Sequence, residues 1–120
     1  MFIKNLEDCP EFVSGDGCRL REFFNPATDS ELRLGYSFAH ARVDPGVATK
    51  PHTLIYSEVY YIISGAGLMH IDSESRAAGP GTVIYIPPGA VQHIENRDET
   101  VLEFVCMVDP AWTPECEKVL

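Results

Sequence analysis

The stretch GVATKPHTLIYSEVYYIISG, Gly46–Gly65, decides the fold of this chain. A turn at residues 44–46 (DPG) opens it and a second turn at residues 64–67 (SGAG) closes it, because Pro and Gly favour backbone angles that a strand does not use. Between the turns, the β-branched and aromatic run EVYYII, residues 58–63, predicts a β-strand.

Two residues of this stretch can bind a metal, His52 and Glu58. They are six positions apart, so both side chains would lie on one face of a sheet if the extended backbone ran unbroken between them. The pair is the first candidate for a functional centre, with Glu58 as a metal ligand or a catalytic base.

The spacing of this stretch resembles the first motif of the cupin superfamily, G(x)5HxH(x)3-4E(x)6G. The matching residues are Gly46, His52, Glu58 and Gly65. The position of the second histidine holds Leu54.

A second stretch resembles the other cupin motif, G(x)5PxG(x)2H(x)3N. The matching residues are Gly81, Pro87, Gly89 and Asn96. Its histidine position holds Gln92, with His93 next in the chain. The resemblance implies an all-β double-stranded β-helix, or jelly-roll barrel, of a kind that is often dimeric. Because both departures fall at metal-ligand positions, it implies the architecture more strongly than the chemistry.

The choice between Gln92 and His93 as the third ligand stays open, and the two exclude each other. Alternation places Gln92, with Ile94 and Asn96, on one face of a short strand and His93, with Glu95, on the other. Regular pairing therefore favours Gln92 as the inward residue, although glutamine is a weaker metal donor than imidazole. A bulge at the preceding turn would instead rotate His93 inward and give two histidines and a carboxylate.

Composition limits the partners and the location. The 120 residues are enough for one domain, residues 1–120, with a barrel core at about residues 30–109. Nine basic and eighteen acidic residues give a net charge of −9, which disfavours nucleic acid and anionic lipid. No apolar run approaches the ~20 residues of a membrane span, and the first ten residues lack the apolar core of an export signal, so we expect a cytoplasmic protein. Without export, the four cysteines are expected to be free thiols.

The remaining pattern predicts further strands around the central stretch. Alternating apolar residues predict one strand over residues 31–44, with a bulge or change of face near His40. A continuous apolar run predicts another at residues 83–86, and a final strand is expected at residues 101–108 with alternate residues on one face. Shorter strands are expected at 19–24, 67–72 and 90–96, with a polar loop at 72–78 and an irregular N-terminal arm that covers a sheet edge. Trp112 in the C-terminal tail is expected to dock on the barrel or on a second subunit. In this register Met69 and Ile71 face inward and His70 faces out.

The expected cavity has polar and apolar walls. Besides the ligands, the side chains expected to line it are His40, Tyr36, Tyr60, Met69, Phe104 and Cys106. His40 is either a hydrogen-bonded core residue or the donor that Leu54 no longer supplies.

Three functions fit these residues. The first is a metal-dependent enzyme, isomerase-like or dioxygenase-like, that uses a divalent ion (Mn, Fe, Zn or Ni) on a small polar metabolite. The second is a non-catalytic ligand-binding or sensor module, with or without metal, which the loss of two histidines favours. The third is a structural barrel filled by apolar side chains.

Apolar residues on both faces of residues 58–63 also require a cover, either the N-terminal arm or a second copy of the chain in a homodimer.

Overall fold

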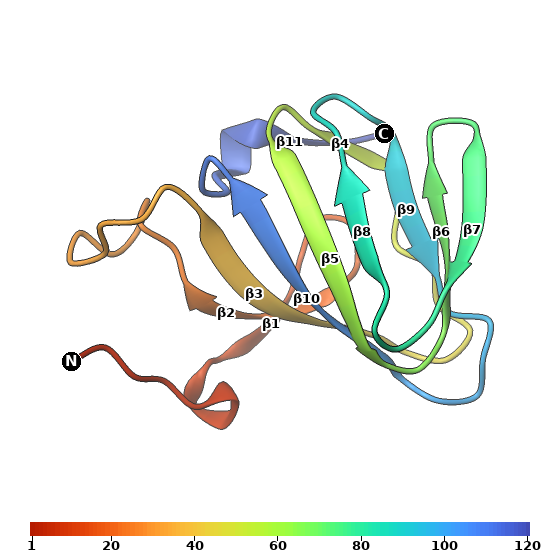
Figure 1. The fold of residues 1–120 in the computed structure, drawn as a ribbon, viewed down its shortest axis with the longest axis horizontal. Helices are drawn as coiled ribbons and strands as arrows, with labels where there is room; N and C mark the ends of the chain where they lie inside the picture. Colours follow the sequence, from red (N-terminus) through yellow and green to blue (C-terminus); the bar gives the residue numbers. More distant parts are fainter.

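Two antiparallel β-sheets packed face to face form the structure, a computed structural model that describes all residues 1–120 (Figure 1). The first sheet has the order β1-β2-β3-β10-β5-β8. Its strands are β1 (Glu11–Val13), β2 (Arg19–Phe24), β3 (Ser37–Val43), β5 (Ser57–Ser64), β8 (Val83–Ile86) and β10 (Leu102–Asp109). The predicted all-β jelly-roll class is confirmed.

The second sheet has five strands in the order β11-β4-β9-β6-β7. Its strands are β4 (His52–Leu54), β6 (Gly67–Ile71), β7 (Glu74–Ala78), β9 (Gln92–Glu95) and β11 (Glu117–Val119). Two short 3-10 turns, η1 (Leu6–Asp8) and η2 (Pro114–Cys116), complete the elements. No helix here has the length and apolarity needed to cross a membrane.

The apolar core lies between the sheets because alternate residues of each strand point inward. The first sheet contributes Tyr60, Ile62 and Phe104, and the second contributes Met69 and Ile94, all buried. A smaller cluster of Leu54, Val108 and Cys116 packs against Trp112, so the tail docks on the barrel as predicted.

Gly65 makes the tight turn between β5 and β6 possible. Its φ of 80° lies in the left-handed region, and a Cβ atom there would collide with the carbonyl oxygen of Val101. Asn96 closes the neighbouring loop, since its side-chain amide donates to the carbonyls of Val43 (2.9 Å) and Thr100 (2.8 Å). These motif residues stabilise the barrel and place no group in the cavity.

The N-terminal arm covers a sheet edge, as predicted. Strand β2 matches the expected residues 19–24 and pairs antiparallel with β3, and β1 then pairs with β2. The arm therefore extends the six-stranded sheet beyond β3. It leaves the outer face of β5 and β8 uncovered, where Val83 and Tyr85 are 66% and 61% exposed.

The structure corrects three predicted elements. Residues 31–36 form no strand, since β3 begins at Ser37 after turns at residues 26–28 and 30–31. The expected polar loop at 72–78 is largely strand β7, whose polar side chains face solvent while its backbone pairs with β6. The C-terminal tail ends in strand β11, which pairs with β4.

Candidate metal centre and cavity

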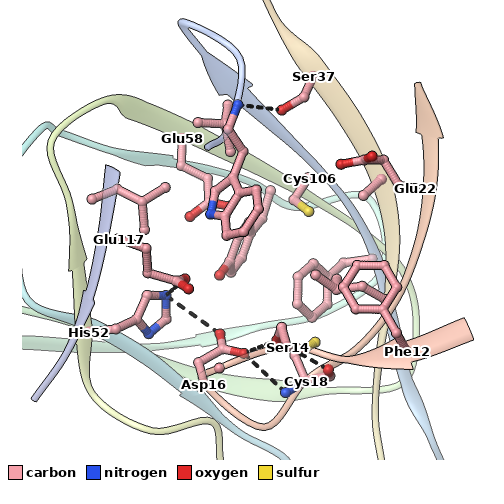
Figure 2. A pocket seen from close by; sticks show the side chains of 18 of the residues that line it. Phe12, Ser14, Asp16, Cys18, Glu22, Ser37, His52, Glu58, Cys106 and Glu117 are labelled. Carbon is pink, nitrogen blue, oxygen red and sulfur yellow. Dashed lines mark hydrogen bonds and ion pairs between the residues drawn. The ribbon is translucent and has the colours of Figure 1, made fainter. Parts of the chain in front are cut away.

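A cavity of about 270 Å³ opens between the two sheets near the N-terminal arm and the C-terminal tail (Figure 2). Its apolar walls include Leu54, Phe104 and Trp112, and its lining contains no Lys or Arg. Its lining includes four acidic side chains and one histidine: Asp16, Glu22, Glu58, Glu117 and His52. The structural-barrel hypothesis requires an interior filled by apolar side chains, and this cavity contradicts it.

His52 begins β4 and is 2% exposed. Its Nδ1 donates to the carbonyl oxygen of Lys50 at 2.8 Å, so in the neutral ring the lone pair lies on Nε2. That nitrogen faces two carboxylates, with Asp16 Oδ2 at 3.5 Å and Glu117 Oε1 at 3.9 Å. The backbone thus fixes the imidazole in the orientation that a metal ligand needs.

Asp16 comes from the loop between β1 and β2. Its Oδ1 accepts hydrogen bonds from the Ser14 hydroxyl and from the Cys18 amide (3.0 Å), which leaves Oδ2 to face His52. The loop is fixed to the barrel because the Lys50 amide donates to the Asp16 carbonyl at 2.7 Å. One segment, at Lys50, therefore orients both Asp16 and His52.

Glu117 comes from the start of β11, whose pairing with β4 brings residue 117 beside residue 54 and residue 119 beside His52. Burial raises the pKa of the Glu117 carboxyl, His52 lowers it and Asp16 raises it. The ligand atoms of Asp16, His52 and Glu117 all lie within 4.8 Å of one another. Figure 2 shows the three side chains converging at one side of the cavity.

Glu58 projects into the same cavity from β5 but lies outside this three-residue group. Burial raises the pKa of its carboxyl to about 8, the Gln92 side chain lowers it in part, and the charges of Asp16 and Glu117 raise it further. Its Oε1 is buried without a hydrogen-bond partner. Glu58 therefore holds a proton at neutral pH and faces the cavity with an oxygen that nothing in the protein satisfies.

Gln92 lies opposite His52 across the β4–β9 pair and is 1% exposed. Its Oε1 accepts a hydrogen bond from the Tyr60 hydroxyl at 3.1 Å, and its Nε2 has no partner. The oxygen through which a glutamine binds a metal is thus already engaged by Tyr60.

The two thiols that line the cavity are held as neutral groups. Burial raises the pKa of the Cys18 and Cys106 thiols well above the usual range, and nearby acidic side chains raise it further. All four cysteines are free and buried. Because the thiolate is the reactive form, the acid–base chemistry of the cavity depends on its carboxyl and imidazole groups.

The structure places the predicted residues in several different environments. His52, Glu58, Tyr60, Phe104 and Cys106 line the cavity. Tyr36 is absent from the lining and packs edge-on against Phe24. Met69 is also absent from it, because it packs in the main core and borders a separate hollow beside β7 and β8.

His40 requires a correction of register. The pairing of β3 with β10 is unbroken from residue 37 to residue 43, without the bulge expected near His40. Ser37 and Ala39 therefore line the cavity, and His40 lies on the opposite face. There its Nε2 contacts Glu103 Oε2 at 3.2 Å.

His93 also lies on the outer face of its sheet, as the alternation along β9 favours. Its ring stacks on that of His70 in β6, with ring centroids 4.1 Å apart. Burial lowers the pKa of His93, and the adjacent His70 lowers it further. His70, expected to be a surface residue, is only 21% exposed in its side chain.

Sequence reasoning missed Asp16 and Glu117. Asp16 stands in a Ser-Gly-Asp-Gly turn, where an aspartate is ordinary turn chemistry. Glu117 lies in a tail with two prolines, where no strand was expected. Only the alternation of Glu117 and Val119 in the last residues gave a signal, and it was too short to predict a strand.

The three residues fit a divalent cation. The buried Asp16 carboxylate and the partly buried Glu117 carboxylate face one imidazole nitrogen, with no lysine or arginine in the lining to balance them. Uncompensated buried charge is costly, and a bound cation would offset it. One nitrogen and two carboxylate oxygens form a hard donor set of the kind that suits Mn²⁺ or Fe²⁺ and accepts Zn²⁺.

Comparison with known proteins settles the family. The Cupin domain family matches residues 39–108, which is more than half of the chain. The chain belongs to the cupin family. An uncharacterized protein of Methanocaldococcus jannaschii is 34% identical over 110 residues, 91% of this cupin and 86% of that protein.

Two further similar proteins have known functions. The oxalate-binding protein of Thermotoga maritima is 27% identical over 115 residues, 90% of this cupin and 93% of that protein. Among solved structures, the nucleoside dehydratase Pac13 aligns with a TM-score of 0.79 and 21% identity, over 100% of this cupin and 91% of that chain. Cupins with this fold thus include enzymes and ligand-binding proteins.

Proposed function

We propose that this cupin is a metal-dependent enzyme that transfers protons on a small polar metabolite bound in the cavity. The observation that carries the proposal is Glu58, a carboxyl group with a pKa of about 8 and an unpartnered oxygen. It faces the same cavity as the three converging donors Asp16, His52 and Glu117. A strongly perturbed acid beside a candidate metal centre is typical of an active site.

The divalent ion would be held by His52 Nε2 and by the carboxylates of Asp16 and Glu117. This replaces the set of His52, Glu58 and Gln92 or His93 expected from the sequence, because Glu58 lies outside the group, Tyr60 engages the Gln92 oxygen, and His93 faces outward. When bound, such an ion acts as a Lewis acid that polarises a carbonyl or hydroxyl oxygen of a ligand.

The residues of the chain supply the proton transfer. In the metal-free protein Glu58 is protonated at neutral pH. A cation bound nearby favours the carboxylate, so in the loaded site Glu58 would exchange between the two forms, as general acid when protonated and as base after it gives up the proton. Tyr60 is fixed by its bond to Gln92 and lies in the wall of the cavity. Burial keeps the pKa of the Glu58 carboxyl group high, in a cavity whose walls include Leu54 and Phe104.

The charge of the cavity restricts the substrate. With four acidic side chains and no lysine or arginine, an anion could bind only through the metal. We therefore favour a neutral, hydroxyl-bearing or carbonyl-bearing metabolite small enough for about 270 Å³. One histidine and two carboxylates also differ from the two histidines and one carboxylate of iron oxygenases, which favours isomerase-like over dioxygenase-like chemistry.

The test uses untagged protein, so that no affinity tag supplies or removes metal. Elemental analysis should find a near-stoichiometric divalent metal that His52→Ala loses. The metal-loaded protein is then incubated in D2O with an extract of small polar metabolites, and mass spectrometry should find one compound that gains solvent deuterium at carbon. Glu58→Gln should retain the metal and abolish the exchange. Metal-free wild type, or no exchange in any compound, would contradict the enzyme assignment.

A non-catalytic ligand-binding or sensor role is the second candidate. The apolar Leu54 at the motif's second histidine position and the engagement of Gln92 by Tyr60 favour it, since both remove donors from the cavity. A relative is described as an oxalate-binding protein. For that role, a compound should copurify with the protein and remain chemically unchanged in prolonged incubation.

We also propose a homodimer formed through the outer face of β5 and β8. Five large apolar side chains are exposed there and on the adjoining β10: Tyr61, Ile63, Val83, Tyr85 and Met107. The N-terminal arm extends the sheet edge and does not cover this face. Light scattering should give twice the chain mass for the wild type and the monomer mass for the double variant Val83→Ser, Tyr85→Ser, whereas a monomeric wild type would refute the dimer.

A further inference from the structure

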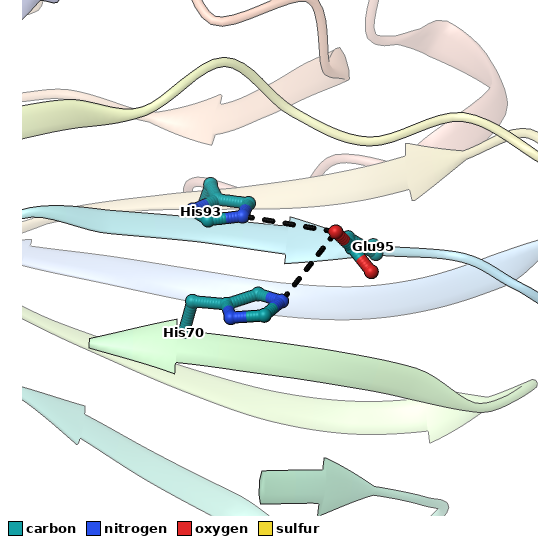
Figure 3. A group of neighbouring side chains, drawn as sticks. All are labelled: His70, His93 and Glu95. Carbon is teal, nitrogen blue, oxygen red and sulfur yellow. Dashed lines mark ion pairs between the residues drawn. The ribbon is translucent and has the colours of Figure 1, made fainter. Parts of the chain in front are cut away.

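Three metal-ligating side chains gather on the outer face of the five-stranded sheet, outside the cavity (Figure 3). His70 on β6 and His93 on β9 are direct cross-strand partners, and Glu95 lies two residues further along β9 on the same face. The two imidazole rings stack with an interplanar angle of 6°. The sheet register alone therefore places two histidines and one carboxylate together.

The donor atoms converge on a single region. Glu95 Oε1 lies 3.5 Å from His70 Nε2 and 3.9 Å from His93 Nε2. All three atoms lie within 4.8 Å of one another. Ligands of a tetrahedral zinc ion with bonds of about 2.0–2.1 Å are themselves roughly 3.5 Å apart, so small side-chain movements would complete the coordination.

Neighbouring side chains hold two of the donors in place. Arg97 Nε donates to Glu95 Oε2 at 2.7 Å, which leaves Oε1 directed at the histidines. The Ser75 hydroxyl lies 2.7 Å from His70 Nδ1 and can accept a hydrogen bond from it, so that Nε2 carries the lone pair. Histidine ligands commonly have such a second hydrogen bond on the ring nitrogen that does not bind metal.

An unsatisfied atom points to a missing ligand. His70 Nε2 is buried and has no hydrogen-bond partner, although Glu95 Oε1 lies within ion-pair distance of it. Simple packing of two rings accounts for the stacking but not for a carboxylate oxygen placed beside both Nε2 atoms. A cation bound to all three atoms would satisfy them together.

We propose that His70, His93 and Glu95 form a second metal site, which binds a divalent transition metal such as Zn²⁺ and leaves a fourth position open to solvent. The site does not depend on the proposed function of the cavity. Strand β9 separates the two, since Gln92 and Ile94 point inward while His93 and Glu95 point outward. Two imidazoles and one carboxylate are a softer donor set than that of the cavity and suit Zn²⁺, Ni²⁺ or Cu²⁺.

The proposal is tested by titrating Zn²⁺ into chelator-treated, untagged protein and measuring heat. In the His52→Ala background, which disables the cavity group, one zinc ion should bind with micromolar or tighter affinity. Loss of an outer-shell partner typically weakens metal binding by about 10–100-fold. Adding His93→Ala or Glu95→Gln removes a ligand itself, so either change should weaken zinc binding by more than that. His40→Gln is the matched control, because His40 also pairs with a glutamate but lacks a third donor.

A spectroscopic measurement keeps the test independent of folding defects in the variants. Long-range ¹H–¹⁵N spectra of the His52→Ala protein should show the Nε2 signals of His70 and His93 shifting on addition of Zn²⁺, while the signals of His40 stay in place. Zinc binding that appears only at millimolar concentration, or that survives unchanged in both His93→Ala and Glu95→Gln, would overturn the proposal.

Discussion

The two donor clusters of this cupin, one inside the barrel and one on its outer face, reach similar geometry by different routes. Asp16, His52 and Glu117 come from segments spread over 102 positions of sequence, and the first two are buried. His70, His93 and Glu95 come from two adjacent strands and are all partly exposed. Burial makes the inner charges dependent on a counter-charge, whereas water already screens the outer ones.

The largest expected difference concerns which metal each cluster prefers. His52→Ala removes the only nitrogen donor of the inner group, so binding of Mn²⁺, a metal that favours oxygen-rich sites, should weaken by about 100-fold or more. His93→Ala should leave Mn²⁺ binding unchanged. Calorimetric titration of both variants with Mn²⁺ measures this, and equal losses in the two would abolish the distinction between the clusters.

The next effect is a pH dependence of stability that originates inside the cavity. The folded pKa of Glu58, about 8, exceeds the ordinary value of 4.5, so between these pH values the folded chain holds a proton that the unfolded chain has lost. The free energy of unfolding contributed by this group is therefore highest at low pH and falls as the pH rises toward 8, by roughly a few kcal/mol.

Glu58→Gln removes that slope. In urea titrations with EDTA present, the stability of the variant relative to wild type should rise between about pH 5 and about pH 8. The exposed Glu115→Gln provides the control, since the same neutralisation at the surface should leave the slope as it is. A variant that tracks the wild type across this range would show that Glu58 ionises normally.

Loss of the hydroxyl at Ser75 should have a smaller effect, confined to the outer cluster. Ser75→Ala removes the partner of His70 Nδ1, so zinc affinity at the outer face should fall by about 10-fold, with Mn²⁺ affinity in the cavity unchanged. Parallel titrations with the two metals measure both. An unchanged zinc affinity would mean that packing against His93 alone orients the His70 ring.

The smallest expected effect is that of Arg97→Gln. The arginine side chain is 71% exposed, and such surface ion pairs contribute about 0–1 kcal/mol, so the urea midpoint should barely move. Zinc affinity should change less than in Ser75→Ala, because the strand still directs Glu95 at the histidines. A large loss of stability would indicate that the outer cluster is coupled to the barrel core.

The same contrast explains what the sequence could predict. Local periodicity located the strand that carries Glu58, and alternation placed Gln92 inward and His93 outward. The separate strand β4 was not predicted, so His52 and Glu58 lie in different sheets and not on one face of a single sheet. The alternation along residues 67–72 also correctly placed His70 outward. The cross-strand pairing of His70 with His93, which forms the outer cluster, was not predicted. Which residues pair across neighbouring strands depends on strand order and register, and motif spacing does not predict either.

The inner cluster was beyond prediction for a different reason. Asp16 is positioned by a loop that bonds to Lys50, and Glu117 by a short strand that forms only because β4 offers an edge. Neither segment has apolar alternation long enough to predict its place. His40 was misplaced because the alternation of residues 32–38 was continued through it, whereas β3 begins only at Ser37 and pairs with β10 without a register shift.

The central claim is that the cavity metal centre consists of Asp16, His52 and Glu117, with Glu58 apart as the proton carrier. Its most direct test is an anomalous difference map from crystals of the untagged protein grown with Mn²⁺. We predict a peak in contact with Asp16 Oδ2, His52 Nε2 and a carboxylate oxygen of Glu117, and none between Glu58 and Gln92. A cavity without a peak, or a peak bound to Glu58 and Gln92, would contradict the account.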